Sequence, residues 1–155
     1  MKRARQRGFT MVELIVSFTI MALLTSMAVP LAAYKVKRDK ERELRYSLRE
    51  IRKAIDAYKD ASAAGKIDVK LGTEGYPESL EILVKGVKLS QSADGKVIKF
   101  LRRIPKDPMT GTYEWGLRSM QDDPTSQSWG GQNVFDVYSK STERARDGTP
   151  YSEWN

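Results

Sequence analysis

The hydrophobic pattern divides the chain into an apolar N-terminal segment and a polar remainder. Leu14 to Ala33 form a run of twenty residues without a charge. As a helix, this run spans roughly 30 Å, the thickness of a bilayer's hydrocarbon core. Basic residues flank it on both sides, but only the cluster before it is free of acids. The positive-inside rule therefore favours a membrane span with a cytoplasmic N-terminus.

A second helical pattern runs from Lys35 to Asp60, a stretch without Gly or Pro. Apolar residues recur in it at spacings of four and three and form one stripe: Leu44, Leu48, Ile51, Ile55 and Tyr58. This stripe predicts that the helix packs on the remaining chain. Gly65 follows as the first strong helix breaker and marks the expected end of the helix.

Beyond Gly65 the pattern changes to short elements separated by turns. Residues 77–84 predict a short helix with Pro77 in its first turn. Two or three short strands are expected, from residues 96–101, 113–117 and 134–138. Residues 119–132 are polar and predict a loop. The expected fold class is α+β, a long N-terminal hydrophobic α-helix packed on a small C-terminal antiparallel β-sheet domain.

The composition removes most catalytic chemistry. The chain has no Cys and no His, so it has no disulfide, no thiolate metal site and no Ser–His or Cys–His pair. No P-loop, dinucleotide fingerprint or spaced carboxylate–metal motif occurs in it. We expect no catalytic residue and no enzyme. A Ca²⁺- or carboxylate-dependent hydrolase is the enzymatic alternative.

The net charge of +7 is unevenly placed. Four of the 27 basic residues precede Gly8, which leaves 23 against 20 acidic residues in the remainder. Between Lys35 and Asp60, ten bases are interleaved with six acids. No aromatic platform alternates with them, as single-strand binding would need. The pattern indicates a solvated or inter-subunit face and argues against a nucleic-acid partner.

Glu13 stands directly before the apolar run. A carboxylate at the centre of a bilayer costs about 2.5–3.5 kcal/mol, and less near the interface. A plain single-span anchor, which is the competing interpretation of the apolar run, has no need of such a residue. We therefore expect Glu13 to have a cationic partner.

Residues 7–14, RGFTMVEL, resemble the prepilin cleavage and methylation motif of the type IV pilin and type II secretion pseudopilin family. The resemblance implies that a prepilin peptidase cuts between Gly8 and Phe9 and methylates the new N-terminal Phe9. Four parts then follow along the chain: a prepilin leader (1–8), a transmembrane or filament-core half-helix (9–34), an amphipathic half-helix (35–64) and a C-terminal globular pilin-like domain (65–155).

The same resemblance gives Glu13 and Pro30 roles in assembly. Cleavage would create an α-amine with a reference pKa of roughly 7.7–8.0, largely cationic near neutral pH. Glu13 of one subunit could pair with the Phe9 amine of a neighbour, and such a head-to-tail contact generates a filament. Pro30 stands where many members carry a helix-weakening proline. A simple kink and local unwinding during assembly are equal alternatives for it.

The C-terminal half resembles, more loosely, the major pseudopilin of type II secretion. The matching positions are Tyr76-Pro77, residues 104–108 (IPKDP), residues 136–139 (DVYS) and Trp154. The resemblance implies a homopolymeric pseudopilus subunit that drives protein export from the inner membrane, with its C-terminal domain periplasmic or extracellular. It also implies minor pseudopilins and an inner-membrane assembly platform as partners. The alternatives are a type IV pilus subunit for adhesion, motility or DNA uptake, and a non-polymerising membrane-anchored binding module.

Many major pseudopilins bind Ca²⁺ in the loop after their last strand, and the matching positions here are Ser139 and Asp147. Calcium takes six to eight oxygen ligands, whereas this loop carries three basic residues: Lys140, Arg144 and Arg146. Calcium at Ser139 and Asp147 is therefore an expectation from resemblance, and a simple turn at Asp147-Gly148 is its alternative.

Overall fold

The computed structural model describes residues 10–90 and 95–154, except for the side chains of residues 27–31. The chain falls into two compact units, Met1–Asp39 and Lys40–Asn155. One long helix, α1 (Met11–Ala63), begins in the first unit and ends in the second. The second unit adds a short helix, α2 (Leu80–Lys85), four short strands and a 3₁₀ turn, η1 (Tyr151–Glu153).

The first unit consists, in its described part, of the N-terminal portion of α1. Three of its hydroxyl groups are satisfied within the helix. Ser17, Thr19 and Thr25 each donate a hydrogen bond to the carbonyl four residues earlier, at 2.7, 2.8 and 2.7 Å. Among the described residues, we find no helix that combines the length and the apolar character needed to cross a membrane.

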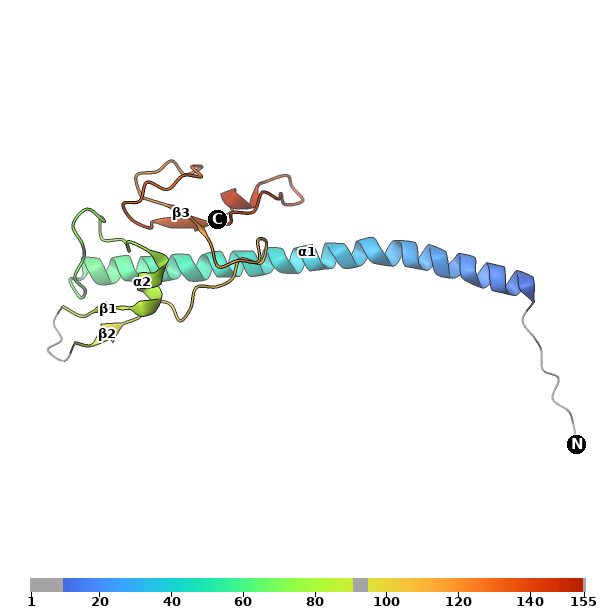
Figure 1. Ribbon diagram of the computed structural model, residues 1–155, viewed down its shortest axis with the longest axis horizontal. Coiled ribbons are helices and arrows are strands. Elements are labelled where there is room, and N and C mark those ends of the chain that lie inside the picture. Colours follow the sequence, from blue (N-terminus) through green and yellow to red (C-terminus); the bar gives the residue numbers. More distant parts are fainter. Residues whose placement is uncertain (1–9, 91–94, 155) are drawn as a thin grey trace, which may run out of the picture. The chain divides into compact units, whose positions relative to one another are not determined.

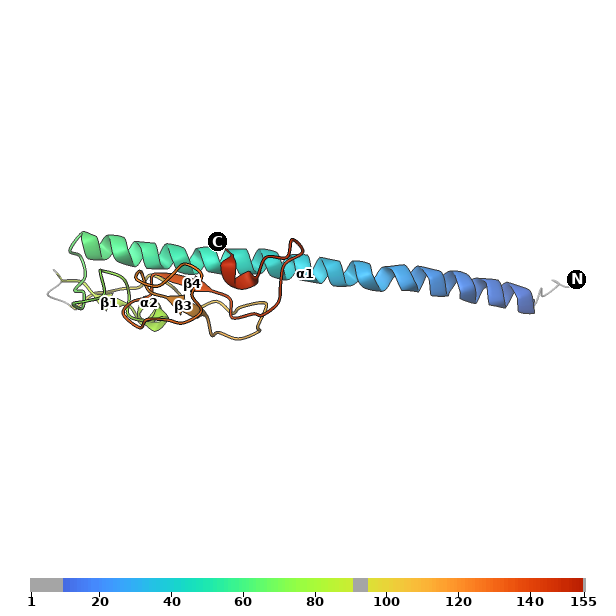
Figure 2. The same cartoon turned by 90° about the horizontal axis from the view of Figure 1, so that it is seen from above.

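The strands of the second unit form two small antiparallel sheets. Strand β1 (Val87–Lys88) pairs with β2 (Val97–Ile98), and β3 (Gly116–Arg118) pairs with β4 (Asp136–Tyr138). In Figure 1 the β1–β2 pair and β3 lie on opposite sides of the axis of α1, and Figure 2 shows both sheets on one face of it. The C-terminal part of α1 thus forms one layer, and the sheets and α2 form the other.

The apolar stripe predicted for α1 is the centre of the core. Each of its side chains is at most 5% exposed: Leu44, Leu48, Ile51, Ile55 and Tyr58. They pack in one cluster with residues from all parts of the second unit, among them Leu83 of α2, Val137 of β4 and Tyr151 of η1. Full burial of one aliphatic side chain stabilises a fold by about 1.5–3 kcal/mol. The predicted α+β class is confirmed.

The end of α1 is built by its backbone. Gly65 has a φ of 64°, a left-handed conformation that glycine adopts without steric cost. The N–H of Gly65 donates to the carbonyl of Ser62 at 2.9 Å, and the N–H of Lys66 donates to the carbonyl of Ala61 at 3.0 Å. This pair of hydrogen bonds is a Schellman motif, as the position of Gly65 in the sequence led us to expect.

Several predicted elements are shorter than expected. The helix predicted at 77–84 begins only at Leu80, because the carbonyl of Pro77 accepts a hydrogen bond from the N–H of Val134 at 2.7 Å. The strand predicted at 96–101 ends at Ile98, because the N–H groups of Phe100 and Leu101 both donate to the carbonyl of Leu83 instead of to a neighbouring strand. Strand β1 was not predicted, because two residues carry no recognisable alternation. The described residues therefore contain four strands where two or three were expected.

Replacement of Leu48 by Ala should lower the free energy of unfolding by about 2–5 kcal/mol, because it empties a fully buried site in the core. Urea unfolding of the full chain in detergent, followed by tryptophan fluorescence, measures the change. Arg49→Ala, at an exposed neighbouring position, is the control and should change stability by less than about 0.5 kcal/mol. Equal effects of the two substitutions would contradict this account of the core.

Candidate functional site

The predicted processing and assembly residues all belong to the first unit. Gly8 and Phe9 lie outside the described residues. Pro30 lies within the bounds of α1, which run across it without interruption, and its side chain is not among those described. A simple kink at Pro30 and local unwinding during assembly thus both stay predictions. Glu13 is described in full, and it occupies the first turn of α1.

Glu13 takes part in a helix cap that was not predicted from the sequence. Its N–H donates to Oγ1 of Thr10 at 3.2 Å, and the N–H of Leu14 donates to the carbonyl of Thr10 at 3.2 Å. Thr-x-x-Glu at residues 10–13 is the sequence signature of a capping box. A carboxylate in the first turn also interacts favourably with the positive end of the helix dipole. Glu13 therefore has a local structural role besides any role in assembly.

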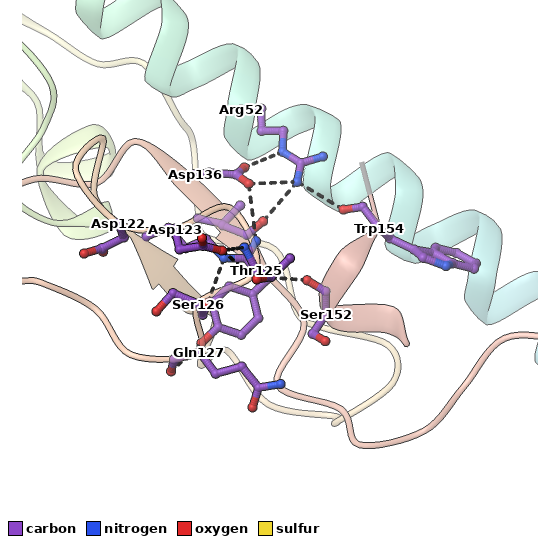
Figure 3. A network of polar contacts seen from close by, with 12 residues as sticks. Arg52, Asp122, Asp123, Thr125, Ser126, Gln127, Asp136, Ser152 and Trp154 are labelled. Carbon is purple, nitrogen blue, oxygen red and sulfur yellow. Dashed lines mark hydrogen bonds and ion pairs between the residues drawn. The ribbon is translucent and has the colours of Figure 1, made fainter. Parts of the chain in front are cut away.

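A polar network of the second unit is centred on Asp136, at the start of β4 (Figure 3). Nε of Arg52, on α1, donates to Oδ1 of Asp136 at 2.6 Å. Nη1 of Arg118, on β3, lies 3.6 Å from Oδ2 of the same carboxylate. Asp136 is 23% exposed and Arg118 only 7%. One partly buried carboxylate thus compensates two guanidinium groups from two different elements.

Both guanidinium groups also donate hydrogen bonds to backbone carbonyls. Nη2 of Arg52 donates to the carbonyls of Val137 and Trp154, at 3.2 and 3.1 Å. Arg118 donates from Nε to the carbonyl of Ser126 at 2.8 Å and from Nη2 to that of Ser152 at 3.0 Å. Figure 3 shows Ser152 and Trp154 within this network, with Arg52 above them on α1. The network therefore fastens the C-terminal segment and the polar loop 119–132 to α1 and β3.

The charge pattern of residues 35–60 indicated a solvated or inter-subunit face for Arg52. No local signal distinguishes it, because Arg45 and Arg49 also directly follow residues of the apolar stripe and are exposed.

The predicted loop at 119–132 is present, and Asp122 organises it. Its Oδ2 accepts the N–H groups of Ser119 and Gly130, at 2.7 and 3.0 Å. These backbone hydrogen bonds, Ser119 first, lower the pKa of Asp122 below its ordinary value.

The two predicted calcium ligands have different hydrogen-bond partners. The hydroxyl of Ser139 donates to Oδ2 of Asp107 at 2.7 Å, and both residues are fully buried. Oδ1 of Asp147 accepts the hydroxyl and the N–H of Thr149, at 2.5 and 3.0 Å, and the hydroxyl bond is the main cause of a lowered pKa of Asp147. Across the part of the chain that the structure describes, acidic side chains form no cluster of three or more able to hold a metal. This donor set does not fit calcium.

The C-terminal segment is seated on α1 by two aromatic residues. Tyr151 is fully buried, and its hydroxyl donates to Oε1 of Glu41 at 2.9 Å. Burial and this hydrogen bond raise the pKa of Tyr151 above its ordinary value. The rings of Tyr151 and Trp154 meet edge to face at 4.9 Å, and the guanidinium of Arg45 lies 4.1 Å from the centre of the Trp154 ring.

Comparison with known proteins gives one family model and several relatives. Residues 3–29 match the family described as the prokaryotic N-terminal methylation motif. The type II secretion system core protein G of Klebsiella michiganensis is 31% identical over 123 residues, which cover 74% of this chain and 75% of the relative. The protein of the same name from Escherichia coli K12 is 31% identical over 114 residues and 70% of each chain. The one from Vibrio cholerae is 28% identical over 118 residues, 74% of this chain and 73% of the relative. No solved structure matches this chain.

Replacement of Asp136 by Asn should lower the free energy of unfolding by about 2–3 kcal/mol, because Arg52 and Arg118 lose their common counter-charge. The expected loss is below the ~3–5 kcal/mol of a fully buried pair, since Asp136 is still partly exposed. Chemical unfolding measures it. Glu114→Gln breaks an exposed pair with Lys140 and should cost less than about 1 kcal/mol. An Asp136→Asn variant as stable as the wild type would show that the network contributes nothing to stability.

Stability should fall as the pH rises through the ordinary tyrosine pKa of about 10, and part of this fall should come from Tyr151. The pKa of Tyr151 is higher in the folded chain, so its contribution is complete below the unfolded-state pKa and is lost as the pH rises above it. Urea unfolding at a series of alkaline pH values gives the free energy of unfolding as a function of pH. This free energy should fall less steeply with pH in Tyr151→Phe than in the wild type. Tyr113→Phe, at a 63% exposed position, should keep the wild-type dependence of this free energy on pH. A dependence in Tyr151→Phe as steep as in the wild type would refute the contribution of Tyr151.

Proposed function

Because the chain belongs to the family of type II secretion system core protein G, we propose that it is a structural subunit of a pseudopilus that drives protein export. It is made as a prepilin, cut by prepilin peptidase between Gly8 and Phe9, methylated on Phe9 and polymerised through α1. The observation that carries this proposal is the methylation-motif match at residues 3–29 in a chain that matches core protein G over 74% of its length.

The N-terminal half of the helix anchors the unassembled subunit in the inner membrane, with the leader in the cytoplasm and the C-terminal domain on the other side. The uncharged run from Leu14 to Ala33 supports this topology. The satisfied hydroxyls of Ser17, Thr19 and Thr25 support it too, since an unsatisfied polar group in lipid costs several kcal/mol. Large apolar side chains of this part of α1, such as Phe18 at 73%, are exposed in the single chain. Lipid covers them before assembly, and neighbouring subunits cover them in the filament.

Glu13 sets the register between subunits by pairing with the Phe9 amine of a neighbour. Its exposed position in the first turn of α1 supports this role, and the capping bond from its backbone N–H does not involve its carboxylate. The filament starts from minor pseudopilins and grows on an inner-membrane assembly platform. The head-to-tail contact repeats without closing, so that one type of contact builds the polymer.

Glu13→Gln should be processed normally but assemble poorly, because it removes one partner of a charge pair whose loss typically costs ~3–5 kcal/mol. Sheared and pelleted filaments, quantified by immunoblot, measure assembly. Glu81→Gln, at an exposed position on α2, is the matched control and should assemble at the wild-type level. Wild-type filament yields from Glu13→Gln would refute the role of Glu13 in assembly, whereas a wild-type protein that yields no filaments would favour a membrane-anchored module that does not polymerise.

The same preparations test processing independently of assembly. The intact mass of the mature protein should lack residues 1–8 and carry one additional methyl group, in the wild type and in Glu13→Gln alike. A native protein that retains its first eight residues would refute the prepilin proposal.

A further inference from the structure

The loop of residues 140–150 joins β4 to η1, and it is the place where family resemblance implies a calcium ion. Calcium requires six to eight oxygens, mostly from carboxylates and carbonyls. Ser139 and Asp147, the two matching residues, are engaged in hydrogen bonds with Asp107 and Thr149 respectively.

Arg144 places a permanent positive charge inside this loop. Its Nη1 donates to the carbonyl oxygen of Gly148 at 2.9 Å, and its backbone forms an antiparallel bridge with Pro150. A guanidinium stays protonated under all physiological conditions and has five N–H donors. It therefore compensates the partial charge of a backbone carbonyl, which is the task that a bound metal ion performs in a calcium loop.

The backbone of the loop closes on itself beside Arg144. The N–H of Ala145 donates to the carbonyl of Thr149 at 2.9 Å, and the N–H of Gly148 donates to the carbonyl of Ala145 at 3.1 Å. Gly148 has a φ of 86°, a conformation that glycine supplies readily in a turn. The Thr149 hydroxyl also accepts Nε1–H of Trp154 at 3.2 Å. The turn is thereby linked to the segment that packs on α1.

We propose that this loop is closed by Arg144 without a metal, and that the domain keeps its fold and stability when calcium is removed. Two further bases, Lys140 and Arg146, lie in the same loop, whereas calcium is bound by oxygen ligands such as carboxylates and carbonyls. This inference goes beyond the proposed function. A pseudopilus can form whether the loop is closed by a metal or by an arginine, so the failure of one does not entail the failure of the other.

Thermal unfolding of the full-length protein in detergent, followed by tryptophan fluorescence in millimolar CaCl₂ and in EGTA, tests the proposal. The Tm should agree within about 1 °C in the two conditions. Saturation of a specific site would raise Tm by several degrees, because a ligand that binds only the folded chain stabilises it. A rise of that size in calcium would overturn the proposal.

Arg144→Gln tests the arginine itself. Amide hydrogen exchange at Ala145, Gly148 and Thr149 should accelerate about tenfold or more in this variant, in CaCl₂ and in EGTA alike, through the loss of a charge-assisted hydrogen bond. Arg103→Gln removes the same charge at an exposed position outside the loop and should leave these amides at their wild-type rates. Unchanged exchange in Arg144→Gln would overturn the proposal. Should that variant fail to fold, the comparison of wild-type protein in CaCl₂ and EGTA decides alone.

Discussion

The second unit depends on the coverage of one stripe of α1. Leu44, Leu48, Ile51 and Ile55 lie in succession on one helix face and are almost completely buried. Strands of two or three residues have too few ladder hydrogen bonds to form stable sheets by themselves. They are held in place because each contributes side chains to the cluster on this stripe. The helix therefore serves as the template on which the small sheets and loops of the domain are ordered.

A second constraint acts where this apolar contact ends. Much of the chain after residue 118 is irregular, and its backbone groups need partners outside regular secondary structure. Arg52 and Arg118 supply donors to four carbonyls, and Asp136 balances their charge. Arginine suits this role because its planar fork has several donors with fixed directions. The loop and the C-terminal segment are held by this polar network rather than by a sheet.

The features that could be predicted from the sequence are those with a strong local signal. The apolar period revealed the buried face of α1, Gly65 revealed its end, and the motif at residues 7–14 revealed the pseudopilin family, which the relatives confirm. The short strands were poorly bounded, because their limits are set by distant contacts such as that between Pro77 and Val134. The pairing of Arg52 with Asp136 spans 84 positions, and nothing in the local pattern indicates it. The cap at Thr10 could have been predicted from the Thr-x-x-Glu spacing of residues 10–13, but Glu13 was interpreted through its charge alone.

The position of that cap has a consequence for maturation. The residue that closes the first turn of α1 is Thr10, and it lies on the retained side of the proposed cut. All four groups of this cap, two from Thr10 and the N–H groups of Glu13 and Leu14, belong to residues that the proposed cut retains. Peptidase action would change the charge and the chemistry of the chain end without removing a group of the cap.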